Sequence, residues 1–239
     1  MNLNYRKAVL VIVFFIGSIS LQSQSLEMDI YDIYVSGKIP EWEPYLYNTC
    51  NNYEQALKQL EIQYAYVAWN IGANNMLAAK KHHRLSMKNA LMLNGKYPDN
   101  ADIHAITGAL YGLEIALIRT KAAPNGFKSF RYINQAIGLN AQSAQAWLQK
   151  ANAEFYAPAV LFRNKHKAID YYHKAIILFG KQNNSGNWQY LNALALTGIA
   201  YTQLHLFAQA RQMYLLALKA EPNFHWVKND LLPNLEKKK

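Results

Sequence analysis

The chain of 239 residues has a single cysteine and no apolar run long enough to cross a bilayer. Because Cys50 has no cysteine partner, an intrachain disulfide is excluded, and we expect a partly buried structural thiol. The apolar run at residues 8–16 has nine residues, whereas a membrane-spanning helix needs about 20. The period-two alternation of strands is also missing, and apolar residues recur at spacings of three and four. The pattern therefore favours an all-α protein.

The sequence also lacks the short motifs of common enzyme classes. No Gly-x-Ser-x-Gly elbow, phosphate-binding glycine loop or His-Glu-x-x-His zinc motif is present. Glu61, Glu114 and Glu154 fall on different predicted helices, and no matching acid or base lies at a useful spacing. We therefore expect no enzyme, no catalytic residues and no cofactor.

The seven histidines show no metal-binding pattern. His82 and His83 are adjacent, and adjacent residues on a helix point about 100° apart, so they cannot both face one ion. His166 and His173 can share a helical face, but no acidic residue occupies a ligand position between them, Asp170 being the nearest. Because zinc sites require a fuller ligand set, we expect surface or interface histidines and no metal.

The first 24 residues have the composition of a cleaved signal peptide. Arg6 and Lys7 form a positive n-region, residues 8–16 form the apolar region, and small residues follow. A membrane anchor is the competing interpretation, but the run is too short for one. We expect cleavage in the range 20–25, with no following cysteine to carry a lipid, and hence an exported, periplasmic protein.

The chain is basic, with a formal net charge of +10 that becomes about +8 when Arg6 and Lys7 leave with the signal peptide. A basic chain raises the question of nucleic acid, but no recognition motif is present and we expect no such partner. Anionic lipid, surface polysaccharide or an acidic protein fits the charge better, so proximity to a membrane surface or polysaccharide is expected. The alternative is that most of these charges lie on solvated faces.

Residues 191–224 carry small and aromatic residues at helical spacings. In order, these residues are Gly198, Tyr201, Phe207, Ala210, Tyr214, Ala217 and Pro222. The small residues allow two helix backbones to approach closely, and the aromatic rings fill the gap between them. Phe207 is expected to open the second helix, and Pro222 to close the unit.

Three further copies of this pattern are expected, at residues 52–98, 101–141 and 143–180. In the copy at residues 101–141, Gly108 and Tyr111 are three residues apart, as Gly198 and Tyr201 are. A loop is expected at residues 121–126 because this stretch contains Pro124 and Gly126. In the third, Pro158 ends the first helix, since proline disfavours helix in the residue before it.

Shorter elements are expected at both ends of these copies. Residues 26–36 and 42–49 are predicted as short helices separated by Gly37 and Pro40. Residues 223–235 place apolar residues on one side, as expected for a C-terminal capping helix that covers the apolar end of a stack of repeats.

The spacing at residues 191–224 resembles the tetratricopeptide (TPR) repeat, a helix–turn–helix unit of about 34 residues. With its further copies, the resemblance covers nearly all of the mature chain. It implies an all-α, TPR-like α-solenoid of about four helix pairs, with capping helices at the N- and C-terminal ends. We therefore expect residues 25–239 to form one domain.

A narrower resemblance rests on the segments ITGALYGLEIAL (106–117), GFKSFRYINQAI (126–137), ANAEFYAPAVLF (151–162) and KAIDYYHKAI (167–176). They are similar to exported TPR proteins of Bacteroidetes-type bacteria, a family largely without assigned function. In that family we expect a Gly-Gly-Asp turn after Tyr-Ala-Pro; this chain has Arg163-Asn164-Lys165 there, so no role of that turn, ion binding included, is carried over. A distant likeness to periplasmic TPR components of TRAP transporters rests on compartment and repeat class alone.

The resemblance implies that the first helix of each pair lines an inner groove. The groove candidates are Tyr66, Trp69, Gln145, Leu148, Asn152, Phe155, Asn192 and Thr202. Aromatic rings supply contact area and amides bind backbone or hydroxyl groups, which suits an extended peptide or a sugar. The alternative is that Tyr66, Trp69 and Phe155 are packing residues, because an aromatic stripe on such a helix is usually buried.

The expected function is a non-catalytic protein-interaction module or adaptor in the bacterial envelope, which binds a protein or peptide segment in this groove. The alternative is a transport-associated accessory protein that binds a small solute or a substrate-binding partner. An open trough would favour a peptide, and a closed apolar cavity near Tyr156 and Pro158 would favour a small molecule.

Overall fold

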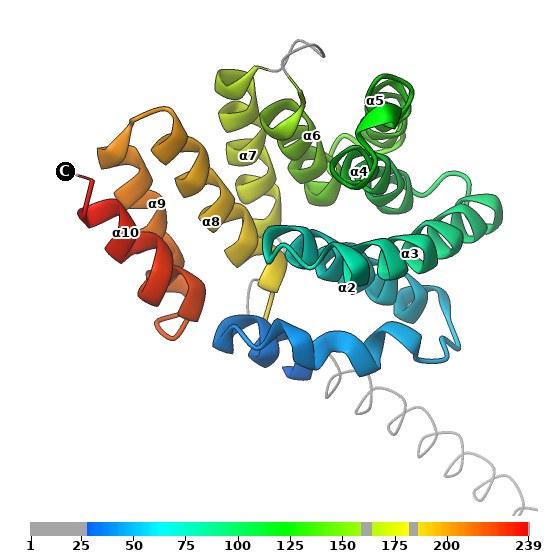
Figure 1. Ribbon diagram of the computed structural model, residues 1–239, viewed down its shortest axis with the longest axis horizontal. Helices are drawn as coiled ribbons and strands as arrows, with labels where there is room; N and C mark the ends of the chain where they lie inside the picture. Colours follow the sequence, from blue (N-terminus) through cyan, green and yellow to red (C-terminus); the bar gives the residue numbers. More distant parts are fainter. Residues whose placement is uncertain (1–27, 159–163, 182–185, 239) are drawn as a thin grey trace, which may run out of the picture.

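The computed structural model describes residues 28–158, 164–181 and 186–238, and every regular element in these ranges is a helix (Figure 1). The prediction of an all-α protein is thereby confirmed. Within the same ranges, no helix combines the length and the apolar character needed to cross a bilayer. The expected signal peptide, residues 1–24, lies outside the described residues.

Eight long helices form four consecutive pairs, and the members of each pair pack against each other. The pairs are α2 (Tyr53–Gly72) with α3 (Met76–Lys96), α4 (Ala101–Leu117) with α5 (Ala122–Leu139), α6 (Ala144–Tyr156) with α7 (Lys165–Gly180), and α8 (Trp188–Gln203) with α9 (Phe207–Ala220). Three pairs fall within the segments predicted at 52–98, 101–141 and 143–180, and the fourth begins at Trp188, before the predicted segment 191–224. In Figure 1 the pairs follow one another in an arc from α2 to α9.

Asparagine and serine side chains start most of these helices. A side-chain oxygen of the residue before the helix accepts a hydrogen bond from a backbone N–H of the first turn, which satisfies a donor that the helix itself leaves unpaired. The capping residues are Asn52 for α2, Asn75 for α3, Asn100 for α4, Ser143 for α6, Asn164 for α7 and Asn187 for α8. Short polar residues therefore cap the first helix of all four pairs.

The connection between α4 and α5 differs from the prediction. A loop over residues 121–126 was expected, but a single 3-10 turn, η2 (Arg119–Lys121), leads directly into α5 at Ala122. Pro124 lies in the first turn of α5, where a missing N–H costs no intrahelical hydrogen bond. The loop prediction was therefore wrong for residues 122–126.

Both ends of the chain add short helical elements to the arc. Residues 28–36 are helical, Gly37 turns the chain with a φ of 75°, and η1 (Ile39–Tyr47) is a 3-10 helix. The second N-terminal helix thus begins before residue 42 and is a 3-10 helix, with Pro44 inside it. At the other end, a π-helical turn, η4 (Trp226–Leu231), runs into α10 (Leu232–Glu236).

Two glycines allow helices of a pair to approach closely. A Cβ on Gly198 would lie 2.2 Å from the Tyr214 ring, and a Cβ on Gly108 would lie 2.8 Å from the carbonyl oxygen of Ser129. Tyr214 is only 1% exposed, so its ring has no space to move aside. The predicted close approach of α8 and α9, with an aromatic ring filling the gap, is confirmed.

Replacing Gly198 with alanine is expected to lower the free energy of unfolding by about 1–3 kcal/mol, because the added methyl group overpacks the contact with Tyr214. Gly95→Ala is the matched control, since nothing lies within 4 Å of a Cβ there, and its higher helix propensity should leave stability unchanged or slightly raised. Urea unfolding followed by circular dichroism measures both. Equal midpoints for the two variants would contradict the close approach.

Candidate functional site

Residues 28–47, which we call the N-terminal segment, bind to the last helix pair and the residues after it. The Tyr34 hydroxyl donates a hydrogen bond to Asn192 Oδ1 on α8 at 3.0 Å, and its ring centre lies 5.3 Å from those of Trp188 and Phe224. The Tyr31 hydroxyl donates to Glu221 Oε2 at 3.0 Å. The segment is thus attached to the far end of the chain by both rings and hydroxyl groups.

The same segment is also attached to the first helix pair. The side-chain amide of Gln63 on α2 donates to the backbone carbonyl of Leu46 at 2.7 Å. On α3, Lys81 Nζ lies 3.4 Å and His82 Nε2 lies 3.5 Å from Glu43 Oε1. The N-terminal segment therefore connects the first and last pairs, and Figure 1 shows it across the open side of the arc.

His82 is a buried, ionisable member of this attachment, with 2% of its surface exposed. Its Nδ1 lies 3.4 Å from the Tyr47 hydroxyl, and its ring meets the Tyr66 ring edge-on at 4.9 Å. Burial lowers the pKa of His82, the charge of Lys81 lowers it further, and Glu43 opposes both. The neutral ring is therefore favoured in the folded protein.

A second polar cluster joins α2 to α6 and α7. The Tyr64 hydroxyl donates to Gln149 Oε1 at 2.9 Å, and the Tyr172 hydroxyl donates to Asn152 Oδ1 at 2.7 Å. Asn152 Nδ2 donates to Gln149 Oε1 at 3.0 Å and completes the network. We call these four residues the tyrosine–amide cluster. Burial raises the pKa of Tyr64 to about 12 and also raises that of Tyr172, so both hydroxyls remain protonated donors.

Tyr156 presents an exposed ring beside this cluster. It lies one helical turn after Asn152, at the end of α6, and 56% of its surface is exposed. Its ring meets that of Phe155 edge-on at 4.8 Å. Burial around its hydroxyl group raises its pKa to about 12, with a smaller contribution from Tyr214. An exposed aromatic residue therefore lies one turn along α6 from the Asn152 amide, which is bonded to Tyr172 and Gln149.

The eight groove candidates lie in different surroundings. Tyr66 and Trp69 stack at 6.0 Å and pack with the N-terminal segment, as expected for packing residues, and Asn192 is bonded to Tyr34 of that segment. The remaining candidates lie on α6 or α8. Leu148 and Phe155 are buried in the core, Gln145 is buried, Asn152 belongs to the tyrosine–amide cluster, and Thr202 bonds to Gly198 of its own helix.

Several important residues were not among the sequence candidates. Tyr34, Trp42 and Trp188 connect the two ends of the arc, and Tyr64 reaches α6 from α2. The density of aromatic residues in the N-terminal segment is the one sequence signal that could have identified a tightly packed element. Contacts between residues so far apart in sequence, however, leave no local spacing pattern that could identify them.

Cys50, His83 and His173 take part in further hydrogen bonds. Cys50 is partly buried, as predicted, with Sγ 3.4 Å from Gln59 Oε1, and burial raises its pKa. His83 Nε2 lies 3.0 Å from the backbone carbonyl of Leu110, and His173 Nε2 lies 2.8 Å from the Tyr201 hydroxyl. These contacts place all three side chains in interfaces between helices or segments.

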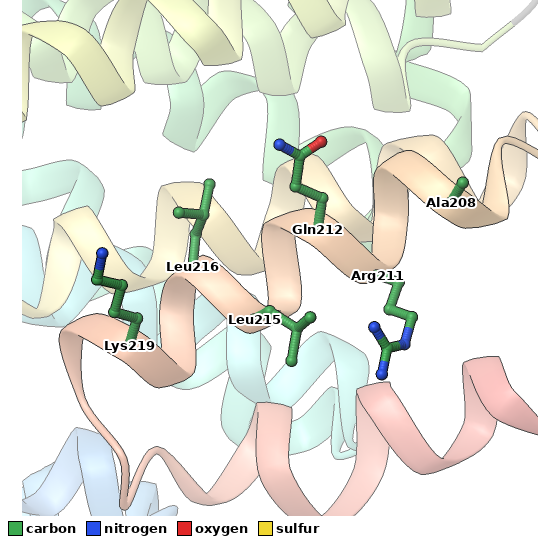
Figure 2. Close-up of a pocket in the computed structure, with 6 residues that line it drawn as sticks. All are labelled: Ala208, Arg211, Gln212, Leu215, Leu216 and Lys219. Atoms are coloured by element: carbon green, nitrogen blue, oxygen red, sulfur yellow. The ribbon is translucent and has the colours of Figure 1, made fainter.

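A separate hollow of about 470 Å³ lies on the outer side of α9. Its lining residues are Ala208, Arg211, Gln212, Leu215, Leu216 and Lys219. Figure 2 shows Arg211 directed toward the C-terminal helices, in line with a distance of 3.9 Å from its Nε to Glu236 Oε1, and Gln212 directed the other way. None of the groove candidates contributes to this hollow.

The Tyr34–Asn192 hydrogen bond can be measured by a double-mutant cycle. Tyr34→Phe and Asn192→Ala are expected to show a coupling energy of about 1 kcal/mol in urea unfolding, because each change removes the same bond. A cycle of Tyr34→Phe with Asn89→Ala serves as the control, since Asn89 bonds to Gln63 instead. No coupling in the first cycle would contradict the attachment of the N-terminal segment to α8.

His82 is expected to make stability depend on pH. Because its folded-state pKa is lowered, the unfolded chain takes up the proton first, as the pH falls through about 6.5. Stability contributed by the neutral ring is therefore present above this pH and lost below it. The free energies of unfolding of the wild type and of His82→Gln, measured at pH 7.5 and 5.5, test this. The stability advantage of the wild type over His82→Gln should be smaller at pH 5.5. An advantage that grows would mean that the Glu43 ion pair dominates instead.

Comparison with known proteins assigns no function to this site. No family model matches the chain, and no curated protein matches it. Within residues 28–158, 164–181 and 186–238, no group of three His, Cys, Asp or Glu side chains is placed to hold a metal ion. The geometry of the N-terminal segment and of the tyrosine–amide cluster is therefore the basis for inferring a function.

Proposed function

We propose that the protein is an exported, TPR-like α-solenoid that acts as a non-catalytic interaction module in the bacterial envelope. It binds a protein or peptide segment on the stretch of α6 that carries Asn152 and Tyr156. Four consecutive helix pairs support the repeat assignment, as does the close approach at Gly198, where a small residue faces an aromatic ring.

The observation that carries this proposal is the way the chain binds its own N-terminal segment. Aromatic rings pack against Trp188 and Phe224, while tyrosine hydroxyls and side-chain amides make the hydrogen bonds. The same two kinds of group recur on α6 as the exposed Tyr156 ring and the Asn152 amide. A partner segment can be held there by the chemistry that already holds residues 28–47.

The exposure of Tyr156 favours a peptide over an enclosed small molecule. A small-molecule site commonly buries most of its ligand in an apolar pocket, but more than half of this ring is exposed. Tyrosine is well suited to contacts with a polypeptide, because it supplies a large rigid ring together with a hydroxyl group. We therefore assign Tyr156 as the main contact residue and Asn152 as a hydrogen-bonding neighbour.

Partner capture tests this function. Tyr156→Ala should reduce the recovery of a discrete partner at least tenfold when the mature chain is crosslinked in its own envelope fraction and the products are identified by mass spectrometry, because loss of a central aromatic contact commonly costs about 2 kcal/mol or more. Phe127→Ala is the matched control, since this ring is also highly exposed, at 73%, but lies on α5 instead of α6. Equal recovery by both variants would overturn the proposed site.

A further inference from the structure

Helix α3 carries positive charge without any acidic residue. Its 21 residues, Met76–Lys96, include no aspartate or glutamate. Its basic residues are Lys80, Lys81, Arg84, Lys88 and Lys96. The other second helices of the pairs show the same bias: α5 and α9 contain no acidic residue, and α7 contains only Asp170. Positive charge is thus concentrated on these helices, most densely on α3.

Four of the five basic residues lie on one face of α3. Lys80, Arg84 and Lys88 follow at steps of four, and Lys81 lies beside them, so their side chains share the stripe that helical periodicity creates. The opposite stripe contains the buried residues Ala79, His82, His83, Ser86, Ala90 and Leu93. All four basic residues are exposed, and the stripe faces away from α2 and α4.

These charges are largely uncompensated. Among the described residues, Lys80, Arg84 and Lys88 have no ion-pair partner. Lys81 contacts Glu43 at 3.4 Å, but 64% of its side chain remains exposed. The face therefore presents a concentrated positive field that attracts an anionic surface.

Large apolar side chains protrude at both ends of the basic stripe. Leu77, before the first lysine, is 85% exposed, and Met92, after the last basic residue of the stripe, is 61% exposed. The two residues are 15 positions apart, which corresponds to about 22 Å along a helix. Leu91, beside Met92, is a further exposed apolar residue. Each end of the stripe thus offers an apolar group that projects outward.

The order of these groups identifies the kind of surface that fits them. Protein interfaces usually place apolar residues at the centre and charges at the rim, whereas here the charges are central and the apolar groups are at the ends. A polysaccharide would leave the protruding Leu77 and Met92 unused. Anionic phospholipid offers phosphate groups to the lysines and arginine and a fluid apolar layer that needs no complementary shape.

We propose that the outer face of α3 docks the protein on an anionic membrane surface. Lys80, Lys81, Arg84 and Lys88 contact lipid phosphates, while Leu77 and Met92 enter the headgroup region. The helix lies parallel to the bilayer, and its buried stripe stays packed on α2 and α4. The docking face is separate from the proposed peptide contact on α6, so either property can be lost without the other.

Vesicle binding by the full chain provides the test. We expect the protein to sediment with vesicles of phosphatidylcholine mixed with phosphatidylglycerol and much less with phosphatidylcholine alone. The triple variant Lys80→Gln, Arg84→Gln, Lys88→Gln should bind the mixed vesicles at least about tenfold more weakly, because each basic residue near such a surface contributes roughly a fivefold factor.

A control variant that loses the same number of positive charges distinguishes docking through this face from general electrostatic attraction to the vesicles. Arg119→Gln, Lys219→Gln, Lys228→Gln removes three exposed positive charges from three different elements. It should keep most of the binding. Residues 1–27 are identical in all variants, so they cannot cause a difference between them. Equal weakening by both triple variants, or equal binding by all forms, would overturn the docking face.

A position-sensitive probe distinguishes lipid contact from other polyanions. In a Cys50→Ser background, a polarity-sensitive fluorophore on Leu77→Cys should shift to the blue with the mixed vesicles, and the same label on Phe127→Cys should not. A shift at both positions or at neither would overturn the proposal. Binding to a soluble acidic polysaccharide or an acidic protein without binding to the vesicles would also overturn it and assign the face to that other partner.

Discussion

The packing of Tyr34 and Trp42 against Trp188 and Phe224 is the contact on which the arrangement of the whole chain depends. Trp42 and Phe224 are completely buried, and their rings belong to elements from opposite ends of the sequence. Burial of each large aromatic side chain contributes about 1.5–3 kcal/mol, and the hydrogen bonds of Tyr31 and Tyr34 then fix the orientation. Without this packing, the first and last helix pairs would be linked only through the pairs between them.

Joining the ends changes what the helix pairs can do. In an open array, each unit contacts only its neighbours, and small changes between units add up to bending of the whole array. Here the N-terminal segment and the tyrosine–amide cluster both connect pairs that are not adjacent in sequence. The position of α6 relative to α2 is therefore fixed by direct contact. A surface that recognises a partner benefits from this fixed geometry, because less conformational entropy is lost on binding.

The elements of this fold that depend on local spacing could be predicted. Gly198 facing Tyr214, the end of α6 before Pro158 and the start of α9 at Phe207 all follow from residues within one helix pair. The start of α5 was missed because proline breaks a helix interior yet is tolerated in a first turn, and spacing alone does not show which applies.

The site was less predictable than the helices because it is formed by residues distant in sequence. The helical period places Asn152 on a particular face of α6, but it does not show that Tyr64 and Tyr172 will meet it there. Likewise, a peptide-binding role for Asn192 could not anticipate that Tyr34 already occupies its amide oxygen. Whether Leu148 faces a groove or the core depends on how neighbouring pairs stack, which a single helix does not encode.

The contact between Tyr31 and Glu221 joins residues 190 positions apart. Closing so long a loop has a large entropic cost, and nothing is gained from it until almost the whole chain is available. During synthesis, the rings of Tyr31, Tyr34 and Trp42 are made early, but their partners in the last helix pair and after it are made last. The aromatic packing that joins the ends can therefore form only when nearly the whole chain is present. A chain cut short before Phe224 retains helix pairs but leaves its first aromatic residues exposed.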